Sequence, residues 1–294
     1  MSFVLGVDEN GLGPVMGPLV VTGVLMGGIP ATWLPGAADS KKFFLSGAPQ
    51  SLRKLEVFCL SLFQALYGYL PGEAASFIRA VAPEACCPTG TNLCWSRLNH
   101  AFSSTCAEEI FEASCNLKNW MEKEGVSFNG LHCQIVCPAR LNTLITRGDS
   151  KSFIDFSCFA QVIRHLAVPG VKIQAGKIGG TKNYLTWLRY AFPEATIKPL
   201  EESHGLSSYQ VSLSGKTYNL EFWVDVEEKS LAAAVASLIG KFVRELFMES
   251  INKALDNQVP VSGYRDRKTK VFLSRILPRL PEKKIPVSCL VRKA

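Results

Sequence analysis

Residues 3–14 read FVLGVDENGLGP. A short apolar run ends there in two carboxylates, Asp8 and Glu9, and a turn of glycines and proline follows at once. Because an unpaired charge beside a core is costly, a buried strand rarely ends in two acids unless they bind a cation or move a proton. The glycines also let backbone amides approach a ligand that a side chain would block. The stretch predicts a first strand that ends in a metal or phosphate site, with a plain acidic turn as the alternative.

The composition is that of a folded globular protein with one large domain or two modest ones. The chain has 294 residues, of which 47% are hydrophobic and 19% charged, and this balance is unlike that of a disordered segment. Its longest apolar stretch, 14–30, is interrupted by glycine and proline, so no transmembrane segment is expected. The N-terminus has no basic region before an apolar one, and we therefore expect a cytoplasmic protein without a membrane partner.

The chain contains ten cysteines, many for a cytoplasmic protein. A structural zinc site normally needs two close C-x-x-C pairs, and this spacing does not occur in the sequence. We expect reduced and mostly buried thiols rather than a metal site.

Positive charge is concentrated near the C-terminus. Residues 265–294 contain ten Lys or Arg and two acids, a balance of +8, whereas the whole chain carries +7 and the rest of it therefore sums to −1. A near-neutral body with a basic end indicates a polyanionic partner. The alternative is a solvated helix face followed by a loose terminus.

Apolar periodicity predicts strands that alternate with helices, which is typical of an α/β layered fold. Strands are expected over 3–8, 18–26, 131–137, 171–175 and 217–226. Helices are expected over 51–68, 150–166, 181–191, 230–254 and 268–277, and a longer one between Trp95 and Trp120. We interpret 73–128 as a helical insertion within a domain spanning 1–258, and 259–294 as a basic helical C-terminal segment.

A second group of acids follows the strand predicted over 217–226. Asp225 and Glu227 are two residues apart, so on a continuing strand they share one face. If this strand neighbours the first one, these acids converge with Asp8 and Glu9. Clustered carboxylates repel one another unless a divalent cation lies between them, and the arrangement therefore predicts Mg²⁺ or Mn²⁺.

Four blocks of sequence together resemble the type 2 ribonucleases H. Residues 6–14 (GVDENGLGP) are similar to that family's G-[IV]-D-E-A-G-R-G-P, and residues 39–42 (DSKK) match its D-S-K-K. Residues 236–245 (ASLIGKFVRE) resemble A-S-I-[LC]-A-K-V-x-R-D, and residues 262–269 (SGYRDRKT) resemble S-G-Y-P-x-D-P-x-T. The blocks occur in the family's order and cover most of the chain except about 73–128, which makes the resemblance specific.

The resemblance implies a ribonuclease H-like mixed sheet flanked by helices. It also implies a metal-dependent endonuclease that cleaves RNA in RNA–DNA hybrids or at ribonucleotides embedded in duplex DNA. In such enzymes four carboxylates hold two metal ions. Asp8 and Glu9 match the first two acids, and Glu227 matches the fourth, which is normally Asp. These three residues are the expected ligands of Mg²⁺ or Mn²⁺.

The resemblance also implies substrate contacts. The backbone of Gly11, Leu12 and Gly13 is expected to approach a phosphate, and Tyr264 matches the tyrosine that faces the ribose 2′-hydroxyl. Three residues of the D-S-K-K match are expected to contact phosphate as well: Ser40, Lys41 and Lys42.

Two departures from the family pattern bear on activity. The third acid of the family falls at Gly176, where this chain has no carboxylate, and Asp225 is a candidate to substitute for it. Leu12 replaces the arginine of the G-R-G motif, so a charged phosphate contact is lost.

Three functions are therefore open. The first is a divergent nuclease that still cleaves, with Asp8, Glu9, Glu227 and Asp225 as catalytic acids. The second is a pseudo-nuclease that binds hybrid nucleic acid without cleaving it. The third is an interaction module that binds a protein partner through 73–128.

Overall fold

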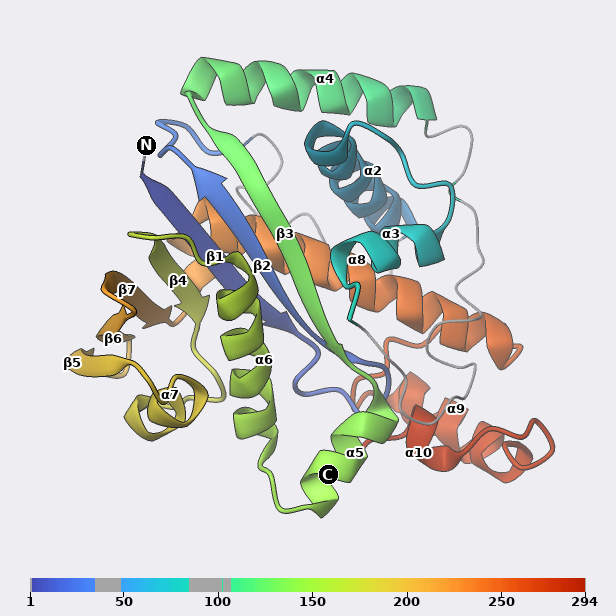
Figure 1. Ribbon diagram of the computed structural model, residues 1–294. Helices are drawn as coiled ribbons and strands as arrows, with labels where there is room; N and C mark the ends of the chain where they lie inside the picture. Colours follow the sequence, from blue (N-terminus) through green and yellow to red (C-terminus); the bar gives the residue numbers. More distant parts are fainter. Residues whose placement is uncertain (1, 35–48, 85–101, 103–106, 294) are drawn as a thin grey trace.

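The centre of the protein is a mixed seven-stranded sheet with the strand order β3-β2-β1-β4-β7-β6-β5 (Figure 1). The computed structural model describes residues 2–34, 49–84, 102 and 107–293. The strands are β1 (Phe3–Asn10), β2 (Leu19–Gly27), β3 (Ser127–Val136), β4 (Lys172–Gly176), β5 (Thr196–Glu202), β6 (Leu206–Leu213) and β7 (Lys216–Trp223).

Helices cover both faces of this sheet. They are α2 (Pro49–Tyr67), α3 (Ala74–Val81), α4 (Ala107–Glu124), α5 (Pro138–Thr146), α6 (Lys151–Leu166), α7 (Leu185–Ala191), α8 (Leu231–Ala254), α9 (Arg267–Ile276) and α10 (Val287–Leu290). Two 3₁₀ turns are also present, η2 (Val226–Glu228) and η3 (Leu277–Arg279). The predicted α/β class, with a mixed sheet flanked by helices, is confirmed.

Strand β1 occupies the middle of the sheet and pairs with two neighbours in different senses. It runs antiparallel to β2 and parallel to β4, with Val7 opposite Ala175. Strand β4 in turn runs parallel to β7. The carboxyl ends of these three parallel strands therefore meet at one edge, which is where ligands bind in open α/β sheets.

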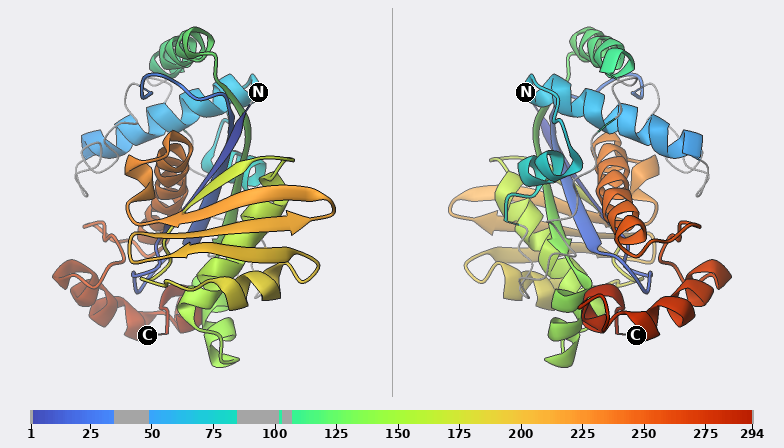
Figure 2. Two further views of the ribbon diagram at one scale, coloured as in Figure 1. Left: turned by 90° about the vertical axis from the view of Figure 1, so that its left-hand side faces the viewer. Right: turned by 90° about the vertical axis from the view of Figure 1, so that its right-hand side faces the viewer.

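Helices α6 and α8 lie on opposite faces of β1 (Figures 1 and 2). Alternation along the strand explains the division, because successive side chains point to opposite faces. Leu5 and Val7 belong to the apolar cluster that includes the buried face of α6. Gly6 lies between them and faces the backbone of Ala233 on α8.

The contact between α8 and the sheet is unusually close and depends on small residues. A Cβ added at Gly6 would overlap the backbone of Ala232 and Ala233. A Cβ added at Gly240 would lie 2.7 Å from Asn10 Nδ2 and 2.8 Å from Thr22 Oγ1. Glycines at both positions thus let the helix rest directly on β1 and β2, with little side-chain volume between the backbones.

Most predicted elements occur close to their predicted bounds, and the missed ones are short or polar. Strands β5 and β6 were not predicted, because β5 is largely exposed and shows no apolar alternation. Helices α3, α5 and α10 were also missed, each with nine residues or fewer. Helix α4 confirms the helical character of the second half of the 95–120 prediction. Of the residues from 95 to 106, only 102 is among the described ones. The domain bounds and the insertion remain predictions.

The predictions about the cysteines and about membrane-spanning segments can be compared with the described residues. Six cysteines in that part of the chain are free thiols, five of them buried and Cys115 exposed, so the predicted burial of most thiols holds for these six. Within the same part, no helix combines the length and the apolar character that crossing a bilayer requires.

Replacing Gly6 with alanine should destabilise the fold. The new methyl group overlaps main-chain atoms of α8, which cannot move aside as a flexible side chain can. We expect Gly6→Ala to lower the free energy of unfolding by about 3 kcal/mol or more, measured by urea denaturation. Gly72→Ala is the matched control, because a Cβ at Gly72 meets open space. Equal stability of the two variants would contradict the close packing of α8 on β1.

Candidate active site

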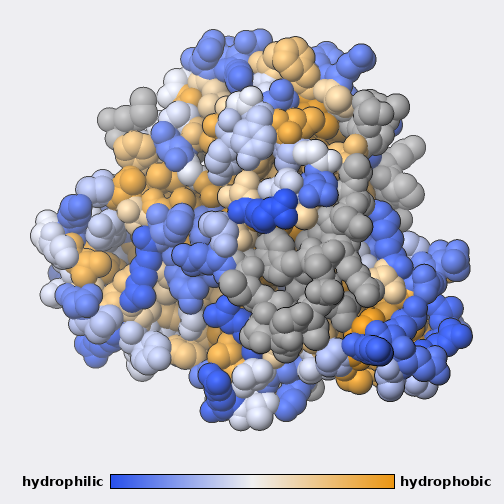
Figure 3. Space-filling model, turned by 45° about the vertical axis from the view of Figure 1, so that its right-hand side comes forward, coloured by the Kyte–Doolittle hydropathy of each residue, from blue (hydrophilic) through white to orange (hydrophobic). Residues whose placement is uncertain are grey.

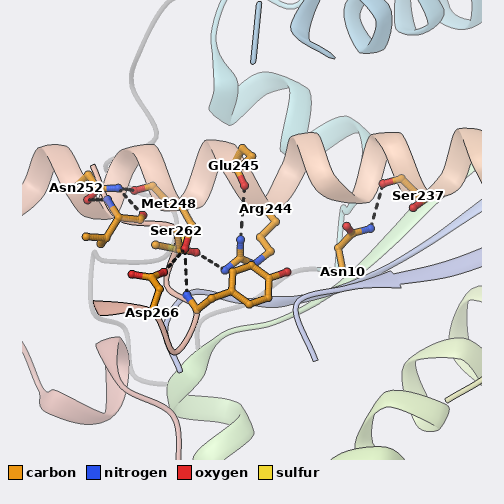
Figure 4. Close-up of polar contacts among 10 residues, drawn as sticks. Asn10, Ser237, Arg244, Glu245, Met248, Asn252, Ser262 and Asp266 are labelled. Carbon is orange, nitrogen blue, oxygen red and sulfur yellow. Dashed lines mark hydrogen bonds and ion pairs between the residues drawn. The ribbon is translucent and has the colours of Figure 1, made fainter. Parts of the chain in front are cut away.

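Asp8 and Glu9 lie near the carboxyl end of β1, where the strand still pairs with β2 but its pairing with β4 has ended at Val7. Asp8 is on the α8 side and accepts a hydrogen bond from the Ser237 side chain. The next residue on that face, Asn10, donates from Nδ2 to the Ser237 carbonyl at 3.0 Å (Figure 4). Helix α8 therefore fixes the end of β1 through one residue, Ser237, that contacts both side chains.

The structure corrects the expected placement of Asp225 and Glu227. Strand β7 ends at Trp223, Asp225 adopts a left-handed conformation with φ 51°, and Glu227 lies in the 3₁₀ turn η2. The two acids therefore do not share the face of a strand. Val226, which lies between them, is buried. The chain turns at Asp225 to bury it, and aspartate is a residue type that tolerates the left-handed region.

Glu227 nevertheless reaches the acids of β1, and Asp225 is exposed. The Glu227 carboxylate is close enough to repel both Asp8 and Glu9. Its position follows from α8, because η2 leads directly into Ser230, whose hydroxyl accepts a hydrogen bond from the Ala233 amide at 3.3 Å. The N-terminal cap thus joins Glu227 to the helix that carries Ser237.

Burial and mutual repulsion disfavour the charged forms of these acids. The pKa of Asp8 is raised to about 7, mainly by burial and also by repulsion from Glu227, whereas the Ser237 hydrogen bond lowers it. Burial also raises the pKa of Glu9 well above its usual range, followed in importance by repulsion from Asp8 and Asp155. A nearby divalent cation would reverse this balance by favouring the ionised forms.

Asp155 is an acid of this cluster that the sequence analysis missed. It lies on α6, is fully buried, and neither of its carboxylate oxygens has a hydrogen-bond partner among the described residues. Burial raises its pKa well above the usual range, and repulsion from Asp8 adds to the rise. A sequence signal existed, because Asp155 precedes Phe159 by four residues and Val162 by seven, and so lies on the apolar stripe of the helix.

Gly176 lies beside the acids, at the end of β4. A Cβ built on it would be 2.8 Å from Asp8 Oδ1 and 3.4 Å from Glu9 Oε2. A side chain at this position would therefore point into the cluster. The following residue, Lys177, is directed elsewhere, since its Nζ donates to the Ser203 carbonyl at 2.6 Å.

The donor chemistry of the cluster fits a hard divalent cation. Carboxylate oxygens are the ligands that Mg²⁺ and Mn²⁺ prefer, and the unpartnered oxygens of Asp155 show that the buried negative charge lacks compensation from the described residues. As the side chains are placed, no group of three or more His, Cys, Asp or Glu residues within the described ranges could hold a metal ion.

The glycine turn after β1 has a packed half and an open half. Gly11 has φ +92°, and a Cβ there would lie 2.8 Å from the Pro18 carbonyl oxygen. The side chain of Leu12 packs against the apolar cluster under α6, so the backbone is the part of this residue left for a ligand. Gly13 is exposed with open space around it, which leaves its backbone accessible.

Tyr264 lies at the surface above a buried arginine. Its side chain is 48% exposed, and the guanidinium of Arg244 is 5.0 Å from the ring centroid. Arg244 extends from α8 and donates from Nη2 to the Ser262 carbonyl at 2.7 Å (Figure 4). The arginine therefore supports both the loop and the ring of Tyr264. The other predicted phosphate contacts, Ser40, Lys41 and Lys42, lie outside the described residues.

Arg292 is a second residue that the sequence analysis missed. Its buried guanidinium donates to the carbonyls of Gly11, Pro14 and Gly17, and its amide donates to the Val15 carbonyl at 2.9 Å. These bonds hold the glycine turn from below. The alternative of a loose basic terminus is therefore wrong for the residues around Arg292, although most of the other basic residues of the segment are exposed.

Comparison with solved structures gives one group of proteins. The chain is similar to ribonucleases HII and HIII. The HII enzyme of Archaeoglobus fulgidus, solved in a complex with PCNA, is 18% identical with a TM-score of 0.47, over 99% of this chain and 93% of that one. Ribonuclease H2 from Pyrococcus horikoshii is 16% identical with a TM-score of 0.47, over 98% and 92%. Bst-RNase HIII in complex with Mn²⁺ is 11% identical with a TM-score of 0.48, over 99% and 66%.

No protein-family model matches the chain, and no curated protein matches it.

The metal-free protein should lose stability as the pH rises from about 4 to about 7. The pKa of Asp8 is about 7 in the folded protein and 3.8 in the unfolded chain, so between these values the folded state retains a proton that the unfolded state releases. Such a group stabilises the fold below its unfolded pKa and loses this effect as the pH passes its folded pKa. Thermal unfolding in EDTA at a series of pH values measures the slope. Asp8→Asn should flatten it, and an unchanged slope would contradict the assignment.

Removing the Arg292 side chain should loosen the glycine turn. Arg292→Gln leaves buried carbonyls without donors, and we expect the free energy of unfolding to fall by about 2 kcal/mol or more. Arg279→Gln, a change at an exposed arginine of the same segment, should alter it by less than about 0.5 kcal/mol. Urea denaturation of both variants provides the measurement. If the two are equally stable, the turn does not depend on Arg292.

Proposed function

We propose that the chain is a divergent type 2 ribonuclease H that cleaves RNA in RNA–DNA hybrids, or at ribonucleotides embedded in duplex DNA. The observation that carries the proposal is the approach of Glu227 to Asp8 and Glu9. Glu227 is more than 200 residues from Asp8 and Glu9 in the sequence, and the three acids form one repelling group at the carboxyl end of β1. The motifs of the four sequence blocks give this group its proposed substrate.

Asp8, Glu9 and Glu227 would hold Mg²⁺ or Mn²⁺ in this proposal. When bound, the metal ions would activate the attacking water and stabilise the leaving oxygen of the phosphodiester. Ser237 orients the Asp8 carboxylate by donating a hydrogen bond to it. Asp225 is exposed and is therefore assigned no place among the ligands.

Two surfaces beside the acids are suited to a nucleic acid. The open backbone at Gly13 is placed to donate to a phosphate, and the exposed Tyr264 ring is available to a ribose 2′-hydroxyl. Hydrophilic side chains gather around α9, where most of the basic residues of 265–293 are exposed (Figure 3). This basic surface supplies the sequence-independent attraction to a polyanion.

A hybrid-cleavage assay tests the proposal. The full chain is incubated with a fluorogenic RNA–DNA hybrid and Mg²⁺ or Mn²⁺, and we expect cleavage within the RNA strand. Asp8→Asn should reduce the rate by at least about 100-fold, more than the loss of a residue that merely supports a metal ligand. Tyr264→Phe tests recognition of the 2′-hydroxyl, and it should reduce cleavage while leaving the affinity for divalent metal unchanged. Identical rates for wild type and Asp8→Asn would refute the nuclease.

A pseudo-nuclease is the second candidate, and the absence of a carboxylate at Gly176 is the observation that favours it. In that case the protein binds hybrid duplex without cleaving it, and the affinity falls steeply with added salt. Binding measured by fluorescence anisotropy at several salt concentrations distinguishes the two. Tight, salt-dependent binding without cleavage assigns the chain to this class, whereas salt-independent binding excludes a phosphate-directed mode.

A protein partner at the 73–128 segment remains part of the proposal. Within it, α4 exposes a large aromatic side chain, Phe111, which is 61% accessible. Cytoplasmic location is likewise proposed, on the sequence features alone.

A further inference from the structure

Asp155 is buried without compensation from the described residues. Its carboxylate is 0% exposed, and both oxygens lack a hydrogen-bond partner among them. The residue lies on a helix whose buried face is otherwise formed mainly by apolar side chains, including Ile154, Phe156 and Phe159. A leucine or asparagine at this position would avoid the cost of burying a carboxylate. The stability of the fold therefore gives no reason for an acid here.

The acid cluster is approached from both faces of the sheet. Helix α8 and the turn before it bring Ser237 and Glu227 to Asp8 from one face. Helix α6 packs on the opposite face, against β1, β2 and β3, and brings Asp155 within repelling distance of both Asp8 and Glu9. The unpartnered carboxylate thus lies near the same two acids that Glu227 approaches from the other side.

Gly176 lets the Asp8 and Glu9 carboxylates come close to the end of β4. The space that a side chain at position 176 would enter is instead bordered by the Asp8 and Glu9 carboxylates. The cluster therefore lacks one acid on β4 and has an additional one on α6. The missing acid and the additional acid offset each other in number. The cluster of this chain therefore still has four carboxylates, as the family pattern does: Asp8, Glu9, Glu227 and Asp155.

We propose that Asp155 supplies the carboxylate that is missing at position 176, so that the divalent-cation site is completed from α6 instead of β4. This inference rests on the proposed function, because it assigns a further ligand to the same site. If it is correct, Asp155 lowers the stability of the metal-free protein and raises the affinity for the metal. The opposite signs of these two effects distinguish a ligand from a residue with a structural role.

The test is Mn²⁺ binding by the full-length protein, measured by isothermal titration calorimetry with MnCl₂ and without nucleic acid. Asp155→Asn should weaken the affinity by at least about tenfold. In EDTA the same variant should melt at a temperature roughly 2 °C or more above wild type, because an uncompensated carboxylate has been removed. Glu56→Gln is the matched control, a half-buried acid on α2 whose pKa is also raised by burial, and it should leave the Mn²⁺ affinity unchanged.

The outcomes separate this inference from the proposed function. Wild-type affinity in Asp155→Asn, or a lower melting temperature or failure to fold in EDTA, overturns the role of Asp155. If one of these results is obtained and the wild type nevertheless cleaves hybrid in the assay above, the nuclease proposal stands without Asp155. If wild type binds no Mn²⁺ and cleaves nothing, both proposals fall.

A transfer variant gives a second measurement. Adding Gly176→Asp to Asp155→Asn returns a carboxylate to the cluster from β4, and the flexible Asp8 side chain is the group that must move to admit it. We expect this double variant to regain most of the Mn²⁺ affinity lost in Asp155→Asn. A folded double variant with no regained affinity would show that the two positions are not equivalent and would overturn the inference.

Discussion

The direct contact between α8 and β1 is the constraint on which the rest of the structure depends. At Gly6 the strand backbone touches the helix backbone, and at Gly240 the helix admits Asn10 and Thr22. This closeness brings Ser237 within hydrogen-bonding reach of both Asp8 and Asn10. Because Glu227 lies in the turn η2 that leads into α8, the same contact also sets the distance of Glu227 to the acids of β1.

The charges around the glycine turn are arranged in two opposite groups. Before the turn, burial and repulsion disfavour the ionised forms of Asp8 and Glu9. After it, the buried guanidiniums of Arg244 and Arg292 lie against the same backbone, at Gly11. The turn therefore passes within a few residues from a region that attracts cations to one that attracts anions.

The sequence predicted the parts of the fold that depend on local pattern. Apolar periodicity located β1 and α8, and the paired acids at the strand end marked the site, because these signals lie within a few residues of one another. The strand face shared by Asp225 and Glu227 was predicted wrongly. Periodicity alone does not reveal that burial of Val226 ends the strand and turns the chain.

Asp155 and Arg292 could not be placed from the sequence for a different reason. Their relation to the site depends on tertiary packing, since Asp155 meets Asp8 across the sheet and Arg292 donates to carbonyls of the glycine turn. Asp155 was at least detectable as an acid on an apolar stripe. Arg292 was hidden among many basic residues, and nothing local marks it as the buried one.

The long separation between Arg292 and the turn it supports has a consequence for synthesis of the protein on the ribosome. Gly11 and Arg292 are 281 positions apart, and a contact of this separation forms late, because a long stretch of chain must be ordered before it can close. The N-terminal strand emerges first, yet its turn acquires its final support only after residue 292 has left the exit tunnel. A nascent chain would therefore carry the acids of β1 without the completed turn until Arg292 has emerged and reached Gly11.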